Sequence, residues 1–557
     1  MKKVSLVIFV SCIFVSCALS FTAIAVAQEN KFAAILGGGT ISGGVQIDAQ
    51  VYQKDTAIGA QDVDEKFRTN SFANIQYING GFSAGMRIEA YIPQMLGYDA
   101  RYSAKKAGIA NYFARYGNDF VDVTAGTFYE QFGSGLILRS YQDWNLGMDN
   151  SILGARAVVT PYSGITLKGI VGTERYFWEY KGMVRGGDME LSLNDMITPM
   201  QDMNTRITLG GSFVSKYQKS EDVYRVDTSG NVNVLNLPAN VASFATRLNI
   251  ESGGFTFSGE YARKVNDPSA ENSWTYNPGQ ALLFNVGYSM KGFGILLSAK
   301  SIDNMGYRLD RNELGQFGMI NYMPALTRQH VYTLPSLYPY ATQPNGEVGF
   351  QIDAQWKTGK KGPSFHLNAS YTGGLKKTIT DDLTYKATPF GLDSNIYFVD
   401  INFDVSHKFN KNWKATLMYM YEIFNQEISG THYGEGKTIN AHIVVGEVTY
   451  SFLKKHALRL EAQYMHTRGG EGEWLMGTLE YTFAPKWFFS LSDQFNFKNP
   501  SREKPLHYYY ATVAFVHDAT RIALSYGRVR QGVVCAGGVC RELPASNGLM
   551  LTLTTNF

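Results

Sequence analysis

Residues 549–557 read Leu-Met-Leu-Thr-Leu-Thr-Thr-Asn-Phe and alternate between two faces of a strand. In an extended chain successive side chains point to opposite faces, so every second residue shares a face. One face is mostly apolar and carries Leu549, Leu551, Leu553, Thr555 and Phe557; the other carries Met550, Thr552, Thr554 and Asn556. The segment therefore predicts a strand with an apolar face that ends on an aromatic ring.

The same alternation recurs along the chain. Residues 41–51, 82–91, 242–250 and 457–465 each set apolar side chains against polar ones with a period of two. We find no long segment with the 3.6-residue period of an amphipathic helix. The sequence predicts an all-β protein whose strands each have an apolar face and a polar face.

The segments between the predicted strands alternate in length. Short turns occur at residues 79–81, 117–119, 163–164, 252–254, 291–292, 410–412 and 454–456. Long polar loops fall between them, at residues 55–66, 95–107, 129–150, 219–239, 266–279, 303–346, 378–393 and 429–438. A soluble sandwich does not separate connection lengths in this way. We predict an antiparallel transmembrane β-barrel over residues 40–557, with short periplasmic turns and long extracellular loops.

Both ends of such a barrel lie in the periplasm, so the number of strands is even. Residues 187–194 supply a strand without which the turns and loops fall out of phase. Including that strand predicts about 24 strands, within a range of roughly 22 to 26.

Composition agrees with a lipid-facing barrel around a polar lumen. Mean hydropathy is −0.18, aromatic residues make up 14%, and the chain has 56 Gly but 16 Pro. A large soluble β-protein is the alternative. The formal net charge of +3 is small for 557 residues and basic residues are not clustered, so nucleic-acid binding is not indicated.

The beginning of the chain predicts export. Lys2 and Lys3 precede an apolar stretch, and Ala25-Val26-Ala27 forms a small-residue cleavage site, so residues 1–27 are predicted as a signal peptide. A membrane-anchor helix and a lipoprotein modified at Cys17 are the alternatives. Residues 28–39 are then a short periplasmic segment. Export and the predicted barrel together indicate an integral protein of the outer membrane of a Gram-negative bacterium.

A closing strand that ends on Phe557 resembles the C-terminal assembly signal of bacterial outer-membrane barrels. That resemblance implies outer-membrane lipid and the barrel-assembly machinery as partners, with other envelope proteins as further candidates. Two cysteines outside the signal peptide, Cys535 and Cys540, are separated by four residues and predict a disulfide. A metal site, the alternative for this pair, calls for further ligands, and no His or second Cys pair lies nearby, so no metal is predicted.

We expect no plug domain in front of the first strand, because about a dozen residues separate Gln28 from the predicted strand near Ile41. The filling then has to come from loops, side chains or another protein. Both charge signs appear on the predicted inner rows: Arg87 with Glu89, Arg247 near Glu260 across a tight hairpin, and Arg459 with Glu461 and Glu480. Such residues brace the wall or select a substrate, and both interpretations stay open.

Two loops are candidates to fold inward. The first contains Tyr129, Glu130, Arg139 and Trp144, with an apolar Leu136–Leu138 segment and glycines at 133 and 135 that permit sharp bends. The second, residues 303–346, contains Arg328, Tyr338 and four prolines. Long ordered loops of this kind are usually functional. They act as caps, as docking surfaces for partners, or as ligand sites.

Enzyme motifs are weak. The nine histidines are scattered, and His432 and His466, which lie near acidic residues, form no recognisable catalytic pattern. We therefore expect no catalytic residue, no enzymatic activity and no cofactor.

Residues 126–156, residues 334–340 and the Cys535–Cys540 loop resemble an uncharacterised family of large outer-membrane β-barrels from Bacteroidota. The resemblance implies the barrel and its location and carries no activity. We expect a porin-like channel for small polar or oligomeric solutes. The alternative is a structural or accessory barrel in an assembly, secretion or surface-display complex.

Overall fold

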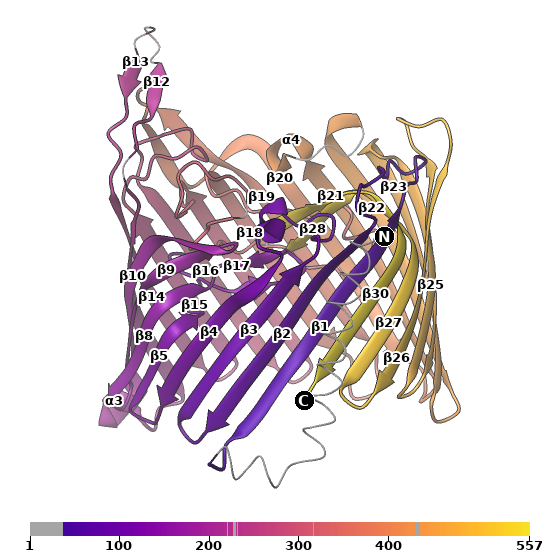
Figure 1. Ribbon diagram of the computed structural model, residues 1–557, viewed down its shortest axis with the longest axis horizontal. Coiled ribbons are helices and arrows are strands. Elements are labelled where there is room, and N and C mark those ends of the chain that lie inside the picture. The colour runs from indigo at the N-terminus through magenta and orange to yellow at the C-terminus, as the bar shows by residue number, and fades with distance from the viewer. Residues whose placement is uncertain are drawn as a thin grey trace.

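The computed structural model describes residues 37–219, 221–226, 230, 232–315, 317–430, 435–537 and 539–557. Within these residues, 24 strands form one closed sheet (Figure 1). Each strand pairs antiparallel with the next along the chain, and β30 pairs with β1 to close the ring. The predicted barrel is therefore confirmed, with the predicted number of strands. Because every wall strand has two neighbours, neither side of the sheet is left with an unpaired edge.

The wall strands are β1 (Thr40–Gln53), β2 (Phe67–Asn79), β3 (Phe82–Tyr91), β4 (Ala107–Gly117), β5 (Val121–Phe128), β8 (Ile152–Tyr162), β9 (Ile165–Tyr176), β10 (Glu179–Ser192), β11 (Thr205–Tyr217), β14 (Asn240–Ser252), β15 (Phe255–Lys264), β16 (Gly279–Met290), β17 (Phe293–Asp303), β18 (Gly346–Lys357), β19 (Ser364–Ile379), β20 (Tyr385–Lys408), β21 (Trp413–Asn425), β22 (Glu435–Phe452), β23 (His456–Gly470), β24 (Glu473–Phe483), β25 (Trp487–Lys498), β26 (Leu506–His517), β27 (Thr520–Val529) and β30 (Ser546–Asn556).

The remaining elements belong to the connections. They are the two-stranded ribbons β6 (Gln142–Asp143) with β7 (Met148–Asp149), β12 (Tyr224–Val226) with β13 (Val232–Val234), and β28 (Gly532–Ala536) with β29 (Val539–Leu543), and the short helices η1 (Ala100–Ala104), α3 (Leu193–Met196), η2 (Thr198–Met200) and α4 (Gln426–Ser429). No helix in the described part of the chain is long and apolar enough to cross a membrane.

Connection lengths differ between the two ends of the barrel. One end, which we name the turn end, carries β1's start, β30's end and mostly tight turns; the other, the loop end, carries the long connections (Figure 1). The strand predicted over residues 187–194 is β10, which ends at Ser192. Two connections at the loop end, residues 177–178 and 471–472, are tight turns, and residues 193–204 form a longer connection at the turn end.

One predicted loop is wrong. Residues 378–393 were expected to form a loop, but β19 and β20 continue through most of this range and leave residues 380–384 between them. The two strands stay paired because their ladder absorbs irregular register shifts between Thr372 and Lys377. The predicted signal peptide and most of the segment 28–39 lie outside the described residues, as does His432.

The closing strand meets the first strand at a glycine. The Phe557 N–H donates to the Gly43 carbonyl at 3.0 Å, and the Gly43 N–H donates to the Phe557 carbonyl at 2.9 Å. A Cβ atom placed on Gly43 would lie 2.7 Å from the Phe557 ring. The aromatic end of β30 therefore fits against β1 where β1 has no side chain.

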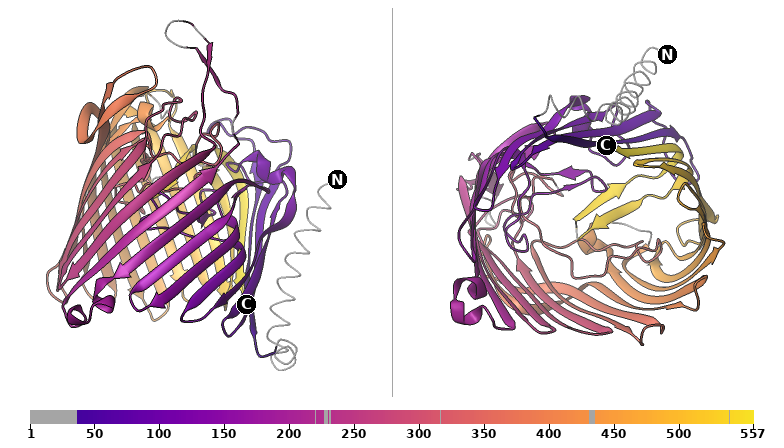
Figure 2. Two further views of the ribbon diagram at one scale, coloured as in Figure 1. Left: turned by 90° about the vertical axis from the view of Figure 1, so that its left-hand side faces the viewer. Right: turned by 90° about the horizontal axis from the view of Figure 1, so that it is seen from below.

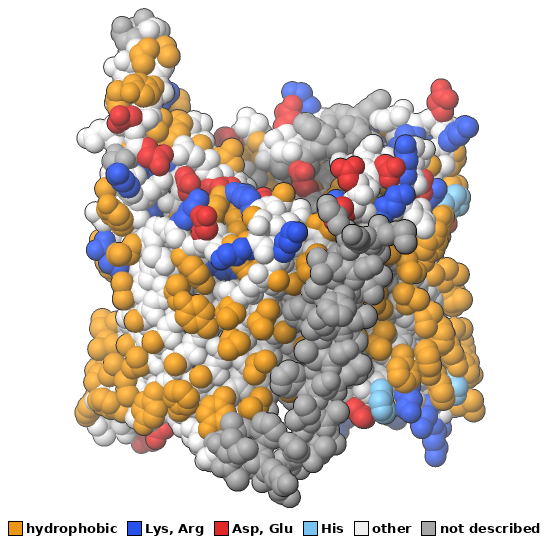
Figure 3. Space-filling view, viewed as in Figure 1, with side chains coloured by type: hydrophobic (Ala, Val, Ile, Leu, Met, Phe, Trp, Pro, Cys, Tyr) orange, Lys and Arg blue, Asp and Glu red, His pale blue; other side chains and the backbone are white. Residues whose placement is uncertain are grey.

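The two faces of the wall have the predicted polarities. Large apolar side chains that point outward stay exposed, among them Leu460, Leu475, Leu491, Leu524 and Leu549, and they form a broad band on the outer surface (Figure 3). At the turn end of β21–β26, stacked aromatic rings line up, including Trp413 on Tyr450 at 4.3 Å between ring centroids. An apolar band edged by aromatic rings is the outer surface of a barrel that faces lipid.

Candidate functional site

The protein's own loops enter the lumen. Three connections from the loop end enter it: residues 129–151, which we name the inward loop; residues 304–345, the strap; and residues 530–545 with β28 and β29, the tip hairpin. Seen along the barrel axis, β6 and β7 and, in yellow, β28 and β29 lie inside the ring of wall strands (Figure 2). We refer to the three together as the loop plug.

The inward loop packs on the inner wall through an apolar segment. Phe132 and Leu136–Leu138 are buried against wall residues such as Val184, Val214 and Ala262. Gly133 has a left-handed φ of 55°, and a Cβ there would lie 2.7 Å from a Glu260 carboxylate oxygen. The next residue, Ser134, donates its backbone N–H to Glu260 at 2.8 Å. The bend that the glycine permits thus brings the loop backbone onto the wall.

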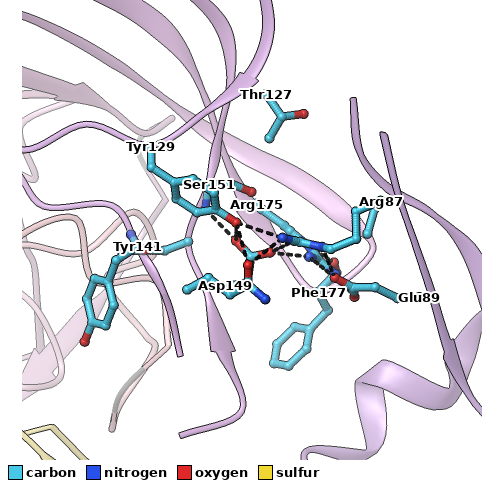
Figure 4. Close-up of polar contacts among 12 residues, drawn as sticks. Arg87, Glu89, Thr127, Tyr129, Tyr141, Asp149, Ser151, Arg175 and Phe177 are labelled. Carbon is cyan, nitrogen blue, oxygen red and sulfur yellow. Dashed lines mark hydrogen bonds and ion pairs between the residues drawn. The ribbon is translucent and has the colours of Figure 1, made fainter. Parts of the chain in front are cut away.

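A buried network of charges joins this loop to the wall (Figure 4). Arg175 of β9 contacts Glu89 of β3 at 2.6 Å and Asp149 of the loop at 2.6 Å. Arg87 of β3 contacts Glu89 at 2.8 Å and also pairs with Asp149. Two guanidinium groups and two carboxylates therefore alternate in a closed set. All four side chains are 5% exposed or less, so none of these charges is solvated by bulk water.

Hydrogen bonds from neutral groups complete the network. The Asp149 Oδ1 atom accepts two hydrogen bonds, one from the Tyr129 hydroxyl at 3.1 Å and one from the Ser151 backbone N–H at 3.0 Å. Burial acts to raise the pKa of Asp149, but Arg175 and Arg87 outweigh it and hold that pKa below its usual value. Asp149 is therefore ionised, and the network acts as an anchor with balanced charge.

Trp144 adds an aromatic contact to the same anchor. Its ring stacks on Phe72 of β2 with centroids 3.7 Å apart, and Arg87 lies over it at 5.2 Å. The cation–π contact and the stacking hold the distal part of the inward loop against β2 and β3.

The strap crosses the lumen. Its first half, with Met305, Tyr307 and Ile320, joins the same apolar core as the inward loop. Its second half, with Leu334 and Tyr338, packs in a separate core against β20–β26 on the opposite side. The inward loop and strap also bond to each other: the Arg139 N–H donates to the Ile320 carbonyl at 2.9 Å, and the Asn321 side chain donates to the Leu136 carbonyl at 3.0 Å.

Lysines on the inner wall hold the strap by its backbone. Lys216, Lys264 and Lys300 are buried and donate to the carbonyls of Arg308, Gly306 and Pro324, respectively. Each also has an acidic neighbour: Asp267 lies 2.6 Å from Lys216 and 3.9 Å from Lys264, and Glu347 pairs with Lys300. Because the lysines donate to backbone carbonyls, these three hydrogen bonds do not depend on which side chains the strap carries.

The tip hairpin closes the plug from a third side. Cys535 and Cys540 form the predicted disulfide across β28 and β29. The Tyr322 hydroxyl of the strap donates to the Gly537 carbonyl at 2.7 Å. A cavity of about 600 Å³ lies between the strap, the tip hairpin and residues 97–99, lined in part by Tyr98, Arg308 and Arg541. The hairpin turns inward, and nothing in its local sequence indicates that turn.

The other predicted lumen residues face inward but differ in their partners. Arg247 does not pair with Glu260; it contacts Asp188 at 2.7 Å and Glu190 at 3.3 Å, while Glu260 accepts from the inward loop. Although Arg247 and Glu260 are opposite in register, Asp188 lies closer to the end of the long arginine side chain. Arg459 contacts Glu461, Glu447 at 2.9 Å and Glu480 at 3.0 Å.

The remaining predicted loop residues all contact the wall or another part of the plug. Glu130 pairs with Arg156 and with Lys168 of the wall. Arg139 lies over Tyr322, 4.0 Å from the ring centroid. Arg328 contacts Asp404 at 2.6 Å, and Tyr338 is buried and stacks on Phe424. In this state the predicted loop residues act as plug contacts.

Sequence reasoning missed Asp149, Arg175 and the wall lysines. Arg175 stands where β9 turns into β10, and there the two-residue alternation no longer tells which face is inside. The lysines lie on β11, β15 and β17, and no local pattern in these strands marks them as partners of strap carbonyls.

The closed wall, its exposed apolar outer band and the loops that enter the lumen define an antiparallel β-barrel of the outer-membrane type. The chain belongs to a family of unknown function, DUF6029, whose model matches residues 1–557. No curated protein matches it.

Solved structures of known barrels are similar at low identity. The siderophore receptor PirA from Pseudomonas aeruginosa has 9% identity, a TM-score of 0.41, and a match covering 93% of this chain and 80% of that one. The outer membrane transporter YddB from Escherichia coli has 8% identity, a TM-score of 0.37, and coverage of 93% and 81%. The FrpB iron transporter from Neisseria meningitidis has 8% identity, a TM-score of 0.37, and coverage of 94% and 84%. The barrel assignment rests on the strand registers, and no substrate is carried over.

Proposed function

We propose that the protein is an integral outer-membrane barrel that works as a gated, porin-like channel for small polar solutes, with the loop plug as its gate. The turn end faces the periplasm and the loop end faces outside. The apolar outer band with its aromatic rings supports insertion in a bilayer. The disulfide supports an oxidising compartment for the tip hairpin.

The observation that carries this proposal is how the plug is attached. It consists of connections between wall strands, held to the wall by ion pairs and by lysine–carbonyl contacts. Such contacts break and re-form without unfolding the strand ladder, because they are not part of it. Polar and charged side chains, including Arg459 and Glu480, line the inner wall and suit passage of water-soluble molecules.

Single-channel recording in planar bilayers tests the proposal. Replacing strap residues 310–340 with a short Gly-Ser linker is expected to yield large, steady conductance steps that the wild-type protein shows rarely. The matched control shortens residues 221–234, which include β12 and β13 and project beyond the wall (Figure 1); it should behave like wild type. A strap variant that folds and remains electrically silent contradicts a channel.

One observation favours a second candidate, an accessory barrel that docks an envelope protein. In the β12–β13 ribbon, Tyr224 pairs with Val234 and Val226 with Val232, so these four side chains share one face, while Arg225 and Asn233 share the other. All four apolar side chains are exposed, at 55–67%. Under this candidate, Tyr224→Ser with Val232→Ser abolishes co-purification of a stoichiometric partner and leaves conductance unchanged.

We further propose that the barrel-assembly machinery reads β30 and Phe557 during insertion. The proposal includes no catalytic step.

A further inference from the structure

A carboxylate is buried without a partner beneath the strap. Glu422 lies on β21, is 1% exposed, and neither of its carboxylate oxygens has a hydrogen-bond partner in the described part of the chain. Its neighbours in register are Asp400 on β20 and Ala441 on β22. Two residues away on the same face, Met420 and Phe424 are fully buried and apolar. Burying an unpaired charge costs several kcal/mol, so such a carboxylate either binds a proton or is neutralised by a cation.

The basic groups around Glu422 are already engaged with other acids. His330 of the strap contacts Asp400 at 2.7 Å, and Asp400 also accepts from Asn402 at 2.7 Å. Arg328 contacts Asp404 at 2.6 Å. Both basic side chains therefore contact aspartates, and neither donates a hydrogen bond to Glu422.

Glu422 lines a cavity whose walls are partly aromatic and partly polar. Arg328 and His330 also line it, and these two side chains contact Asp404 and Asp400. The cavity has a volume of about 320 Å³ and lies between the strap and the tip hairpin. Tyr338, Tyr340 and Phe398 line it together with Glu422, and Tyr340 stacks on Phe398 with centroids 5.2 Å apart. Aromatic ring faces attract cations, and quaternary ammonium groups are commonly bound by rings with a nearby acid.

We propose that this cavity is a binding site for a small organic cation carrying an ammonium group, with Glu422 as its counter-ion and Tyr338, Tyr340 and Phe398 as the aromatic part of its walls. A divalent metal fits less well, since Ca²⁺ and Mg²⁺ take six or more ligands and Zn²⁺ takes four, and no group of three potential His, Cys, Asp or Glu ligands occurs in the described residues. The occupant is a free solute and not a lipid headgroup, because β20 and β21 separate the cavity from the bilayer. The inference does not depend on the channel proposal: a cation occupies the plug whether or not solutes pass.

Calorimetric titration of the full-length protein in detergent tests the site. Choline is the probe, and 3,3-dimethylbutan-1-ol is its uncharged isostere of nearly equal shape. We expect saturable one-to-one binding of choline at millimolar concentration or below and no saturable binding of the alcohol. Glu422→Gln, which keeps the shape and removes the charge, should weaken choline binding at least about tenfold. Glu503→Gln, an exposed substitution in the 499–505 connection, is the matched control and should bind as wild type.

Three results overturn the inference: no choline binding to folded wild-type protein, equal binding of choline and the alcohol, or choline binding that Glu422→Gln leaves unchanged. The first means that Glu422 is a buried neutral acid, and the second that the cavity is merely apolar. If Glu422→Gln fails to fold, the comparison of choline with the alcohol on wild-type protein still decides. None of these outcomes bears on conductance, so the channel proposal is tested separately.

Discussion

Asp149→Asn tests whether the buried charge network is what holds the inward loop in the lumen. The substitution keeps the size of the side chain and removes its charge. Arg87 and Arg175 then share a single carboxylate, Glu89, although both guanidinium groups remain almost fully buried. Hydrogen bonds from Tyr129 and Ser151 can still reach the amide oxygen, so the loss is mainly one of charge balance.

Removing one partner of a buried ion pair typically costs about 3–5 kcal/mol. Because the strand ladder does not include Asp149, we expect this cost to fall on docking of the loop. Each 1.4 kcal/mol is a factor of ten, so the undocked fraction should rise by roughly 10² to 10⁴. The wall itself should stay folded.

Two measurements follow the loop and the wall separately. Trypsin cleavage after Arg139, which is engaged by Tyr141 and Tyr322 in the docked state, reports loop release. Resistance to unfolding in detergent on heating reports the wall. Asp518→Asn is the matched control, since its side chain is 90% exposed in a tight turn and should change stability by less than about 0.5 kcal/mol. If Asp149→Asn and Asp518→Asn are cleaved at the same rate, the network does not hold the loop.

Four further predictions follow from the same contacts. Acidification should release the inward loop. The pKa of folded Asp149 lies below its usual value of 3.8, so its stabilising contribution is present above that value and is lost as the pH falls through the lowered pKa. Cleavage of the Leu136–Leu138 segment by pepsin, a protease active in acid, measures the release. Gly43→Ala should reduce heat-resistant folded barrel because its Cβ would meet the Phe557 ring at 2.7 Å and the Asn74 carbonyl at 2.4 Å, whereas Gly446→Ala, with open space around it, should fold normally; equal yields would contradict the fit of Phe557 on β1. Lys300→Met should destabilise strap docking by about 3–5 kcal/mol, and adding Glu347→Gln should restore part of that loss in a double-mutant cycle; additive effects would contradict a direct pair. Reducing the Cys535–Cys540 disulfide should lower the stability of the tip hairpin by about 2 kcal/mol and increase conductance fluctuations. The double variant Cys535→Ser with Cys540→Ser should make the conductance insensitive to reductant.

The wall could be derived from sequence because its rules are local. Alternation in segments such as residues 457–465 follows from the geometry of one strand, and turns such as residues 291–292 follow from a few adjacent residues. The even strand number follows from where the two ends must lie. The exception is residues 378–393, whose polar composition predicts a loop. In the structure β19 and β20 continue through most of this range, because their pairing tolerates irregular register shifts.

The plug was partly foreseen. The apolar Leu136–Leu138 segment indicates an inward loop because apolar side chains are poorly suited to water. The strap is a candidate because it is a long ordered loop. Their attachment points were not foreseen, because each is a pairing of residues far apart in the chain. Arg175 finds Glu89 at a separation of 86 residues, and Tyr322 finds Gly537 at 215.

By itself, the sequence of this protein determines a closed barrel with an apolar outside, a polar inside and loops gathered at one end. Local periodicity and turn chemistry suffice for that, since strand faces and hairpin pairing involve neighbours in the chain. Only the tertiary structure decides that Arg247 pairs with Asp188 instead of Glu260, that the tip hairpin enters the lumen, and that Glu422 is left without a partner. These features depend on contacts between residues that are far apart in the chain: Asp188 and Arg247 lie on β10 and β14, which β11 separates in the wall, and the tip hairpin meets the strap.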